Sequence, residues 1–488
     1  MSKANPSHID LQAIAMEVVR ARGFHPDFAP EVERQIIALH AHPPEIAAGT
    51  NARDMRDLLW SSIDNDTSRD LDQIEMAQQL PNGDAKVFVG IADVDAYVPK
   101  LSPIDLHAAR ETTTVYAAVR NFPMLPEELS TGTTSLLENQ DCLSVVVEFA
   151  VDQQGHVTAS DVYRALVRNK AQLRYNSLGA WLEGKGPAPP TVAASADLQA
   201  QLQLQNRIAQ KLKAQRFAHG ALSLQTSEIL PLIVQDQVVG LQPQQKNYAT
   251  ELIEDFMIAA NGVVARMLEK VSSLRRVVKQ PERWDRIVQL AAELGEKLPA
   301  DPDSKALNDF LVKRKNAAPE QFADLSLAVV KLIGRGEYVL ERPGDPVPGH
   351  FGLAVQDYTH STAPNRRFAD VVTQRIIKAK LAGKPNPYSD SELDAVAANC
   401  TEKENAANKV ERDMSKRLAA VAMQNKIGAV FDAVVTGVKP HGTFVRAIQA
   451  HVEGLLAQGG KGIDVGDRLR VKLIRTDVQH GFIDFVRI

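Results

Sequence analysis

The chain contains 488 residues, of which 44% are apolar and 24% charged, and its formal net charge is −4. This length allows several domains, whereas the near-neutral charge does not indicate a globally basic nucleic-acid-binding surface. No stretch reaches the roughly 20 apolar residues of a membrane span, the N-terminus lacks a signal-peptide pattern, and Cys142 and Cys400 cannot form a disulfide framework or a cysteine-rich zinc site. We therefore expect a cytoplasmic protein without a membrane partner.

The first hundred residues carry a net excess of negative charge. They hold 9 Lys and Arg against 16 Asp and Glu, a balance of −7 that leaves +3 for the rest of the chain. Residues 10–40 contain two runs of apolar residues at helical spacing, separated by a break from Gly23 to Pro30. We predict that residues 1–50 form a short helical segment with one or two amphipathic helices.

Three aspartates, Asp64, Asp70 and Asp72, lie within nine residues, just after the apolar run 58–60. Carboxylates that gather in this way repel one another unless a cation compensates them, and oxygen ligands suit Mg²⁺ or Mn²⁺. Asp70 and Asp72 are two residues apart, so both side chains project from one face of an extended segment. A divalent-cation site is one interpretation, and a solvated acidic turn is the other.

The middle of the chain alternates patterns typical of strands and helices. Short apolar runs between turns predict strands within residues 51–175, including 85–91 and 145–149. The breaker-rich segment 184–190 predicts a loop. Helical spacing and end signals predict the following helices: 198–212, 250–271, one starting at Pro364, and a long one over 391–425. This order indicates an α+β arrangement.

The last part of the chain, from Ile427, is rich in short strands and turns. Over residues 426–488 the stretch resembles an S1-type RNA-binding OB fold, which implies a small five-stranded barrel. Phe444, His441 and Arg446 are candidates for an exposed strand face that stacks bases and binds phosphates. For Phe444, a place in the barrel core is the alternative.

Several motifs resemble, in order, those of the ribonuclease II (RNB-domain) family of exoribonucleases. The family pattern I-D-x5-D-x-D-D is matched at Asp64, Asp70 and Asp72, with Gln73 at its fourth acidic place. The resemblance covers roughly residues 51–420 through further segments: IADV at 91–94, PMLPEELS at 123–130, AQLRY at 171–175, LIEDFM at 252–257, HFGLA at 350–354 and YTHSTAPNRRFAD at 358–370.

The resemblance implies a fold and an activity. We expect an RNB catalytic domain with a mixed sheet and helices over residues 51–425, between the N-terminal helical segment and an S1-type barrel. Residues 1–50 leave no room for the cold-shock domains that most members carry there. The implied protein is a monomeric, processive 3′→5′ exoribonuclease that hydrolyses single-stranded RNA to 5′-mononucleotides. Because Gln73 lacks a negative charge, an RNA-binding protein with weak or lost catalysis is the alternative.

The family pattern also assigns catalytic roles to residues. Asp64, Asp70 and Asp72 are the implied ligands of Mg²⁺ or Mn²⁺, with the Gln73 amide as a weak fourth ligand and Asp72 as the least replaceable. Arg366 matches the arginine that activates the phosphate, close to the start of the helix predicted from Pro364. Arg367 is its companion, for which a surface salt bridge is the alternative.

Other positions match RNA contacts of the family. Tyr116 corresponds to an aromatic that stacks on the RNA, and Tyr175, Glu254 and Asp255 correspond to positions that meet the ribose 2′-hydroxyl, which distinguishes RNA from DNA. Glu411 aligns with an acidic residue near the RNA 3′ end. A packed aromatic with a satisfied hydroxyl is the alternative for each tyrosine, and a salt bridge on a helix face is the alternative for Glu411.

Overall fold

A six-stranded mixed sheet lies at the centre of the catalytic region. In this computed structural model, residues 10–42, 52–225, 229–234, 237–243, 246–346, 348–440 and 442–488 are described. The sheet has the order β1-β8-β2-β3-β4-β7. Its strands are β1 (Arg53–Asp54), β2 (Trp60–Asp64), β3 (Gln73–Gln79), β4 (Ala85–Ala92), β7 (Asp141–Val151) and β8 (Val157–Arg174).

Strands β2 and β3 are antiparallel neighbours, and the acidic segment 65–72 is the connection between them. On its other side β2 pairs with β8 in parallel, so that Asp64 lies opposite Arg174. Asp64 therefore ends one strand and Asp72 comes just before the next. The pairing of β2 with β3 thus places both ends of the acidic segment at the same end of these two strands.

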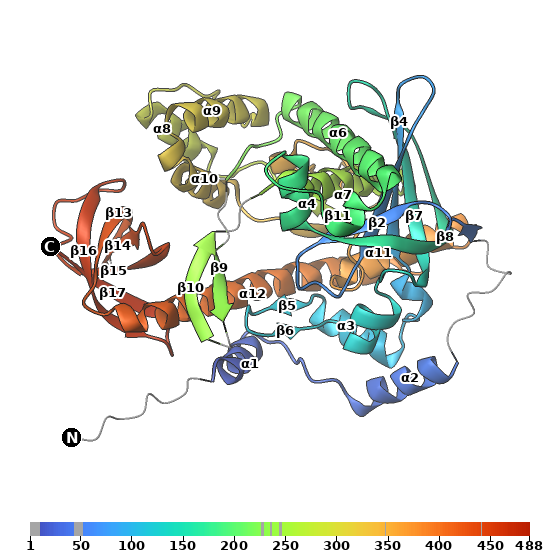
Figure 1. Ribbon diagram of the computed structural model, residues 1–488, viewed down its shortest axis with the longest axis horizontal. Coiled ribbons are helices and arrows are strands. Elements are labelled where there is room, and N and C mark those ends of the chain that lie inside the picture. Colours follow the sequence, from blue (N-terminus) through green and yellow to red (C-terminus); the bar gives the residue numbers. More distant parts are fainter. Residues whose placement is uncertain are drawn as a thin grey trace.

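Helices cover the sheet on both sides (Figure 1). On one side lie α4 (Tyr175–Leu182), α6 (Ala196–Ala218) and α7 (Tyr248–Met267). Asn247 begins α7 with a capping box, and its side chain packs where Gly179 has none, so any larger residue at position 179 would clash. Phe256 of α7 meets Phe149 of β7 edge to face at 6.4 Å, which anchors this helix on the sheet.

A helical insertion separates two paired strands, β11 (Ser273–Val277) and β12 (Glu337–Glu341). It consists of α8 (Trp284–Glu293), α9 (Ser304–Ala317) and α10 (Pro319–Ile333). These helices bury their own apolar cluster, which includes Trp284, Phe310 and Phe322. The insertion is therefore a small packing unit beside the sheet.

The long predicted helix is confirmed as α12 (Asp390–Met423), 34 residues that begin with a capping box at Ser389. It runs beneath the sheet layer towards the C-terminal barrel (Figure 1). The other helices on this side are α3 (Pro103–Glu111) and α11 (Phe368–Leu381). In the described part of the chain, no helix combines the length and the apolar character that a bilayer crossing requires.

The predicted helix start at Pro364 is wrong, because α11 begins at Phe368. Residues 366–368 instead run beside Thr112 and Thr114. The Thr114 backbone N–H donates to the Arg366 carbonyl at 3.0 Å, and the Phe368 N–H donates to the Thr112 carbonyl at 2.8 Å. The chain makes a single turn after Pro364, in which the Arg367 N–H donates to the Ala363 carbonyl, and these bonds then hold Arg367 extended, so that the helix begins only at Phe368.

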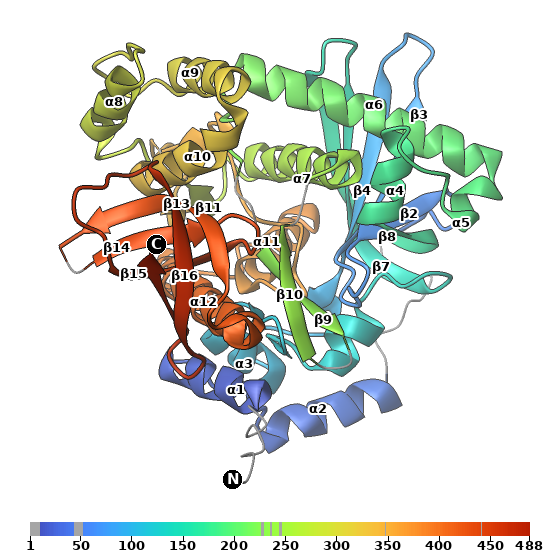
Figure 2. The same cartoon turned by 60° about the vertical axis from the view of Figure 1, so that its left-hand side comes forward.

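The C-terminal barrel is confirmed as a closed sheet of five strands in the order β13-β14-β15-β17-β16. The strands are β13 (Val430–Lys439), β14 (Gly442–Ala447), β15 (Val452–Gln458), β16 (Arg468–Asp477) and β17 (Phe482–Arg487). Ala420 and Met423, at the end of α12, complete its apolar core. Figure 2 shows the barrel in front of α10 and α12, and Arg446 of β14 forms an ion pair with Asp324 of α10 at 2.6 Å.

The two predicted N-terminal helices are confirmed as α1 (Leu11–Ala21) and α2 (Pro30–Ala41). Ile14 and Val18 of α1 share an apolar cluster with Val410 and Met414 of α12. The same cluster includes residues of the hairpin formed by β5 (Val115–Tyr116) and β6 (Asn121–Phe122). The N-terminal segment therefore packs directly on the catalytic region.

Candidate active site

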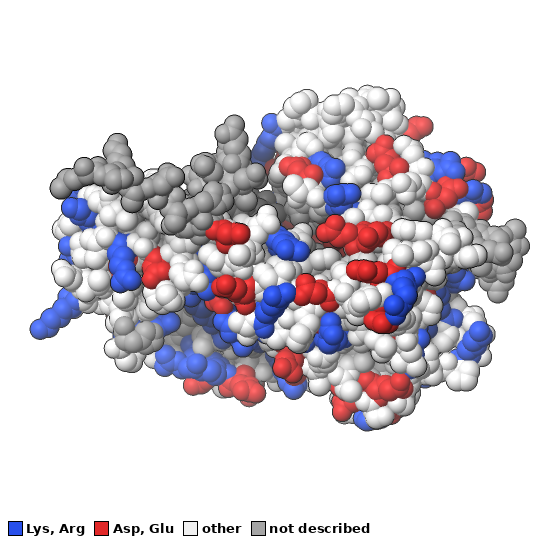
Figure 3. Space-filling view, turned by 90° about the horizontal axis from the view of Figure 1, so that it is seen from below, with Lys and Arg blue, Asp and Glu red and all other residues white. Residues whose placement is uncertain are grey.

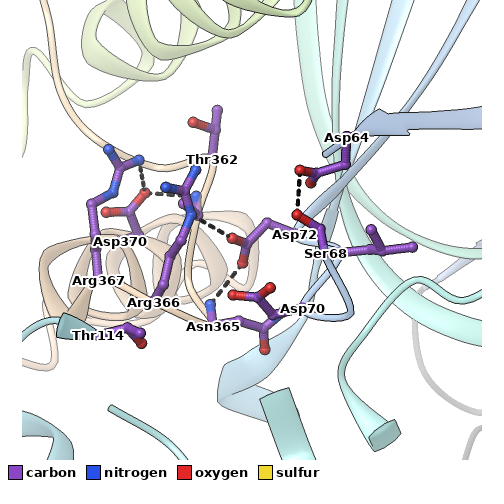
Figure 4. Close-up of polar contacts among 12 residues, drawn as sticks. Asp64, Ser68, Asp70, Asp72, Thr114, Thr362, Asn365, Arg366, Arg367 and Asp370 are labelled. Atoms are coloured by element: carbon purple, nitrogen blue, oxygen red, sulfur yellow. Dashed lines mark hydrogen bonds and ion pairs between the residues drawn. The ribbon is translucent and has the colours of Figure 1, made fainter. Parts of the chain in front are cut away.

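The acidic segment faces the loop that precedes α11. Figure 4 shows Asp64, Asp70 and Asp72 opposite Asn365 and Arg366. One carboxylate oxygen of Asp64 accepts hydrogen bonds from the Asn65 backbone N–H and the Ser68 hydroxyl, both at 2.7 Å. These bonds close a turn immediately after β2. The turn sends the chain back across the end of the sheet, so that all three aspartates stay in one region.

Asp72 is held by two donors that come from far along the sequence. Its Oδ1 accepts from the Asn365 backbone N–H at 2.8 Å, and its Oδ2 accepts from Nε of Arg366 at 3.0 Å. The Asp72 side chain is 2% exposed, whereas that of Arg366 is 44% exposed. Within the described residues, Arg366 pairs with Asp72 through Nε and its terminal nitrogens make no hydrogen bond, so they can donate to an oxyanion.

Burial raises the pKa values of two aspartates in the acidic segment. Burial raises the pKa of Asp72 to about 7, although Arg366 opposes the shift, and the neighbouring Asp70 charge adds to it. Burial also raises the pKa of Asp70, to which Asp64 contributes. One arginine thus leaves net negative charge in a partly buried place, where a cation would be strongly favoured.

The residues present fit a hard divalent cation that keeps some of its water. Asp64, Asp70 and Asp72 supply carboxylate oxygens, which Mg²⁺ and Mn²⁺ prefer. In the described part of the chain, however, no three His, Cys, Asp or Glu side chains come close enough to enclose an ion by themselves. Water and an RNA phosphate would therefore have to complete the coordination. Gln73, the buried first residue of β3, adds no charge.

Both predicted tyrosines lie next to the acidic segment. The Tyr116 hydroxyl donates to Oδ2 of Asp70 at 3.3 Å. Tyr175 begins α4, directly after Arg174, the strand partner of Asp64. Burial, followed by the charges of Asp64 and Glu75, raises the pKa of Tyr175. Both rings are half-buried, so each can still present an edge or a face to a ligand.

Arg367 lies beside Arg366 but has a different environment. Its guanidinium donates to Oδ1 of Asp370 at 2.7 Å, and the same oxygen accepts from the Ala363 backbone N–H at 2.8 Å. The Asp370 side chain is fully buried. The two residues therefore brace the loop that carries Arg366, and the surface salt bridge considered for this pair is in fact a buried one.

The sequence reasoning missed the residues that fix this loop. The Asn365 side chain accepts from the Thr134 hydroxyl at 2.6 Å. The Asn261 side chain on α7 accepts from the backbone N–H and the hydroxyl of Ser361, each at 2.9 Å. The density of polar residues in 358–370 was the available signal, because a buried loop needs partners for its backbone groups.

The acidic pair on α7 is not brought to the aspartates as a unit. Asp255 is 1% exposed and its carboxylate is paired with Arg216 of α6, although burial still raises its pKa to about 6. Glu254 is more exposed and pairs with Lys246 at 2.6 Å. Asp255 therefore joins two helices, whereas Glu254 is the more exposed member of the pair.

Two further predicted positions lie on α12 and on the C-terminal barrel. Glu411 is half-buried on α12, within the stretch that packs against α1. Phe444 is half-buried on β14, between the core residues Thr443 and Val445, so its ring faces outward and the barrel-core alternative is wrong. The Lys439 ammonium lies 5.2 Å from this ring. His441 lies outside the described residues.

The surface offers no large field of one sign on the face shown in Figure 3, where acidic and basic side chains alternate. This agrees with the near-zero net charge. On this face, attraction of a polyanion would therefore depend on local groups and not on a continuous basic patch.

Comparisons with known proteins agree with this geometry. A profile of the RNB domain matches residues 52–383, and one described as the RNase II-type exonuclease C-terminal S1 domain matches residues 429–488. The chain belongs to the RNB family. It is thus a member of a family of 3′→5′ exoribonucleases that act on single-stranded RNA.

Individual RNB proteins are similar over most of the chain. Ribonuclease R of Thermotoga maritima is 29% identical over 95% of this chain and 68% of its own length, and that of Escherichia coli is 28% identical over 93% and 59%. Mycoplasma genitalium RNase R, solved with ribose-methylated single-stranded RNA, has a TM-score of 0.87 at 23% identity, covering 98% of this chain and 78% of that one. A yeast pseudonuclease has a TM-score of 0.71 at 17% identity, covering 93% and 56%. The RNB fold therefore occurs with and without catalysis.

Proposed function

We propose that this RNB protein hydrolyses single-stranded RNA processively from its 3′ end and releases nucleoside 5′-phosphates. In each cycle water attacks the terminal phosphodiester phosphorus, and the bond between phosphorus and the 3′ oxygen breaks. The released nucleotide keeps the phosphate on its 5′ oxygen, and the shortened RNA regains a 3′-hydroxyl. The observation that carries the proposal is the junction of Arg366 with the buried, acidic segment at Asp72.

Arg366 would bind the scissile phosphate. Asp72 holds Nε, which orients the guanidinium plane and leaves the terminal nitrogens to donate to two phosphate oxygens. Asn365 fixes the other Asp72 oxygen through its backbone, so neither partner has to rearrange when RNA arrives. Such preorganisation places positive charge where the phosphate gains negative charge during attack.

The acidic segment would hold Mg²⁺ or Mn²⁺ through Asp64, Asp70 and Asp72, with the Gln73 amide oxygen as a weak ligand. A divalent cation bound there would offset the phosphate charge and lower the pKa of the attacking water. Tyr116, which donates to Asp70, keeps that carboxylate oriented from the opposite side.

The RNA chain would be recognised at several points along its path. The half-buried rings of Tyr116 and Tyr175 offer surfaces for the terminal nucleotides, and Tyr175 with Glu254 would read the 2′-hydroxyl. Asp255 would support them through its pair with Arg216. Phe444 on the barrel would stack on a base upstream, and Glu411 would lie near the path.

One digestion tests the proposal. A 5′-labelled RNA incubated with Mg²⁺ should shorten from the 3′ end without accumulating intermediates, and a chelator should stop the reaction. A DNA of the same sequence should persist, because it lacks the 2′-hydroxyl. An RNA that remains intact with both Mg²⁺ and Mn²⁺ would contradict the proposal.

An RNA-binding protein without catalysis is the second candidate. Gln73 favours it, because the amide cannot replace the charge of a fourth carboxylate. The three aspartates and Arg366 favour the enzyme, since a protein that only binds RNA has no need of three neighbouring carboxylates that share one arginine partner. Both cysteines are free and buried, which fits a reducing cytoplasm. We also propose that the protein is a monomer.

A further inference from the structure

Glu75 is a buried carboxylate for which the activity described so far has no use. It lies in the middle of β3, between Ser61 of β2 and Val89 of β4. Its side chain is fully buried, and neither carboxylate oxygen has a hydrogen-bond partner. Buried carboxylates are normally paired with a cation or with donors, because losing hydration without replacement is strongly unfavourable.

Glu75 lies on the strand next to that of Asp64, because Ser61, which is opposite Glu75, comes three residues before Asp64 on β2. Burial raises the pKa of Glu75 well above its usual value, and the one charge that adds to this is Asp64. The charges of Asp64 and Glu75 both raise the pKa of the Tyr175 hydroxyl, after the larger effect of burial. Among the described residues, no Lys or Arg forms an ion pair with Glu75. The two carboxylates thus belong to neighbouring strands, and among the described residues Asp64 also forms no ion pair, although the charge of Arg366 acts on it.

Glu75 also stands in a particular relation to Gln73. Side chains two residues apart on a strand share one face of the sheet, so the side chains at 73 and 75 point the same way from β3. Position 73 is where the family pattern has its fourth carboxylate. The chain thus lacks a carboxylate at position 73. At position 75, the next position on the same face of β3, it has the unpaired carboxylate of Glu75, whose side chain is one methylene longer than that of an aspartate.

We propose that Glu75 replaces the missing carboxylate and binds, directly or through one water, the divalent cation held by Asp64. This inference rests on the proposed metal-dependent hydrolysis. It accounts for the carboxylate without a partner, since a cation in this position would compensate Asp64 and Glu75 together. It also makes Gln73 compatible with an active enzyme, because the total number of carboxylates around the cation is then preserved.

The test measures Mn²⁺ binding to the full chain without RNA, by electron paramagnetic resonance of the free ion. Glu75→Gln removes the charge but keeps the shape, and it should weaken Mn²⁺ binding at least tenfold. Adding Gln73→Asp to Glu75→Gln should restore most of the affinity, because the carboxylate returns to the family position. The matched control is Glu111→Gln, which alters a buried acid that is paired with Arg110 on α3 and should leave Mn²⁺ affinity unchanged.

An unchanged Mn²⁺ affinity in Glu75→Gln would overturn the proposal and make Glu75 a structural acid. If Glu75→Gln fails to fold, Glu75→Val carries the same test, because valine suits a buried strand position. The measurement separates this inference from the proposed function. If Glu75→Gln binds Mn²⁺ more weakly but the wild type leaves RNA intact, the cation site is supported and the nuclease is refuted. If Glu75→Gln binds Mn²⁺ normally and the wild type degrades RNA, the nuclease is supported and the role of Glu75 is refuted.

Discussion

Arg366 donates from Nε to Oδ2 of Asp72 at 3.0 Å, across a sequence separation of 294 residues. This bond joins the acidic connection between β2 and β3 to the loop before α11. The group that would bind the phosphate and the group that would bind the cation therefore form one unit. Displacing either partner should alter the other, and this coupling underlies the first two predictions.

Replacing Asp72 with Asn should abolish hydrolysis while RNA affinity stays similar or rises. The amide keeps the shape of the side chain but removes a charge that the cation needs, and it weakens the orientation of Arg366. Single-turnover rates and equilibrium binding to the same labelled RNA would measure the two effects separately. A variant that retains more than about a tenth of the rate, a barrier change under about 1.4 kcal/mol, would show that the assignment of Asp72 is wrong.

Arg366→Ala and Arg367→Ala should fail in different ways. Removing Arg366 should slow the chemical step by about a hundredfold or more, since a preorganised donor to the phosphate is lost. Removing Arg367 leaves Asp370 buried without its partner and should mainly lower the melting temperature. Thermal melts and rates at saturating RNA distinguish the two, and equal losses of stability would argue against separate roles.

Gln73→Asp should lower the metal concentration needed for the half-maximal rate. The additional carboxylate sits at the start of β3, next to the acidic segment, and increases the attraction for the cation. Titrations of the rate with Mg²⁺ and with Mn²⁺ would measure the change, and the wild type should show the larger preference for Mn²⁺. Superimposable titration curves for the wild type and Gln73→Asp would show that Gln73 does not weaken metal binding.

The contribution of His107 to stability should be lost as the pH drops from about 6.5 towards 4, whereas the raised pKa values of Asp72 and Asp255 act in the opposite direction over the same range. Burial against Phe28 lowers the pKa of His107 to about 4, so between these values the unfolded chain binds the proton and the folded chain does not. The contribution is present above pH 6.5 and amounts to about 3 kcal/mol at most. Denaturant unfolding at several pH values should show a shallower acid loss in His107→Gln than in the wild type. The exposed His40, changed to Gln, should leave the profile as it is.

Phe444→Ala should weaken binding of single-stranded RNA by about 1–3 kcal/mol, the range for loss of one base stacked on an aromatic ring. Its rate at saturating RNA should stay close to that of the wild type, because β14 belongs to the C-terminal barrel and not to the catalytic region. Phe482→Ala is the matched control, since Phe482 is 57% exposed on β17, a strand that does not pair with β14. Equal affinities of both variants and wild type would remove the barrel face around Phe444 from the RNA path.

Local patterns were sufficient for the elements that depend on neighbouring residues. The five barrel strands and α12 were predictable because turn residues, alternation and a capping box lie within a few residues of the elements that they define. The family pattern likewise located Asp64, Asp72 and Arg366. The hydrogen bonds that join them were beyond such patterns, because a backbone N–H such as that of Asn365 carries no residue-specific signal.

The errors have the same origin. Pro364 has the local features of a helix start, but pairing of residues 366–368 with the distant residues 112–114 holds Arg367 extended, so that the helix begins only at Phe368. The ion pair of Asp255 with Arg216, on another helix, was likewise beyond any local pattern. Periodicity also failed to predict α8–α10, whose apolar faces are satisfied within their own cluster.

The length of helix α12 determines how the C-terminal barrel is oriented relative to the catalytic region. The beginning of this helix is fixed by the Lys100–Glu392 ion pair at 2.7 Å, and its last turn is part of the barrel core. Each added residue would advance the barrel by about 1.5 Å and turn it by about 100°, which would separate Arg446 from Asp324. Only insertions close to whole turns, such as seven residues, would return the barrel to nearly the same orientation. In relatives of this chain, length changes within α12 should therefore occur in such steps, whereas the surface loops can vary freely.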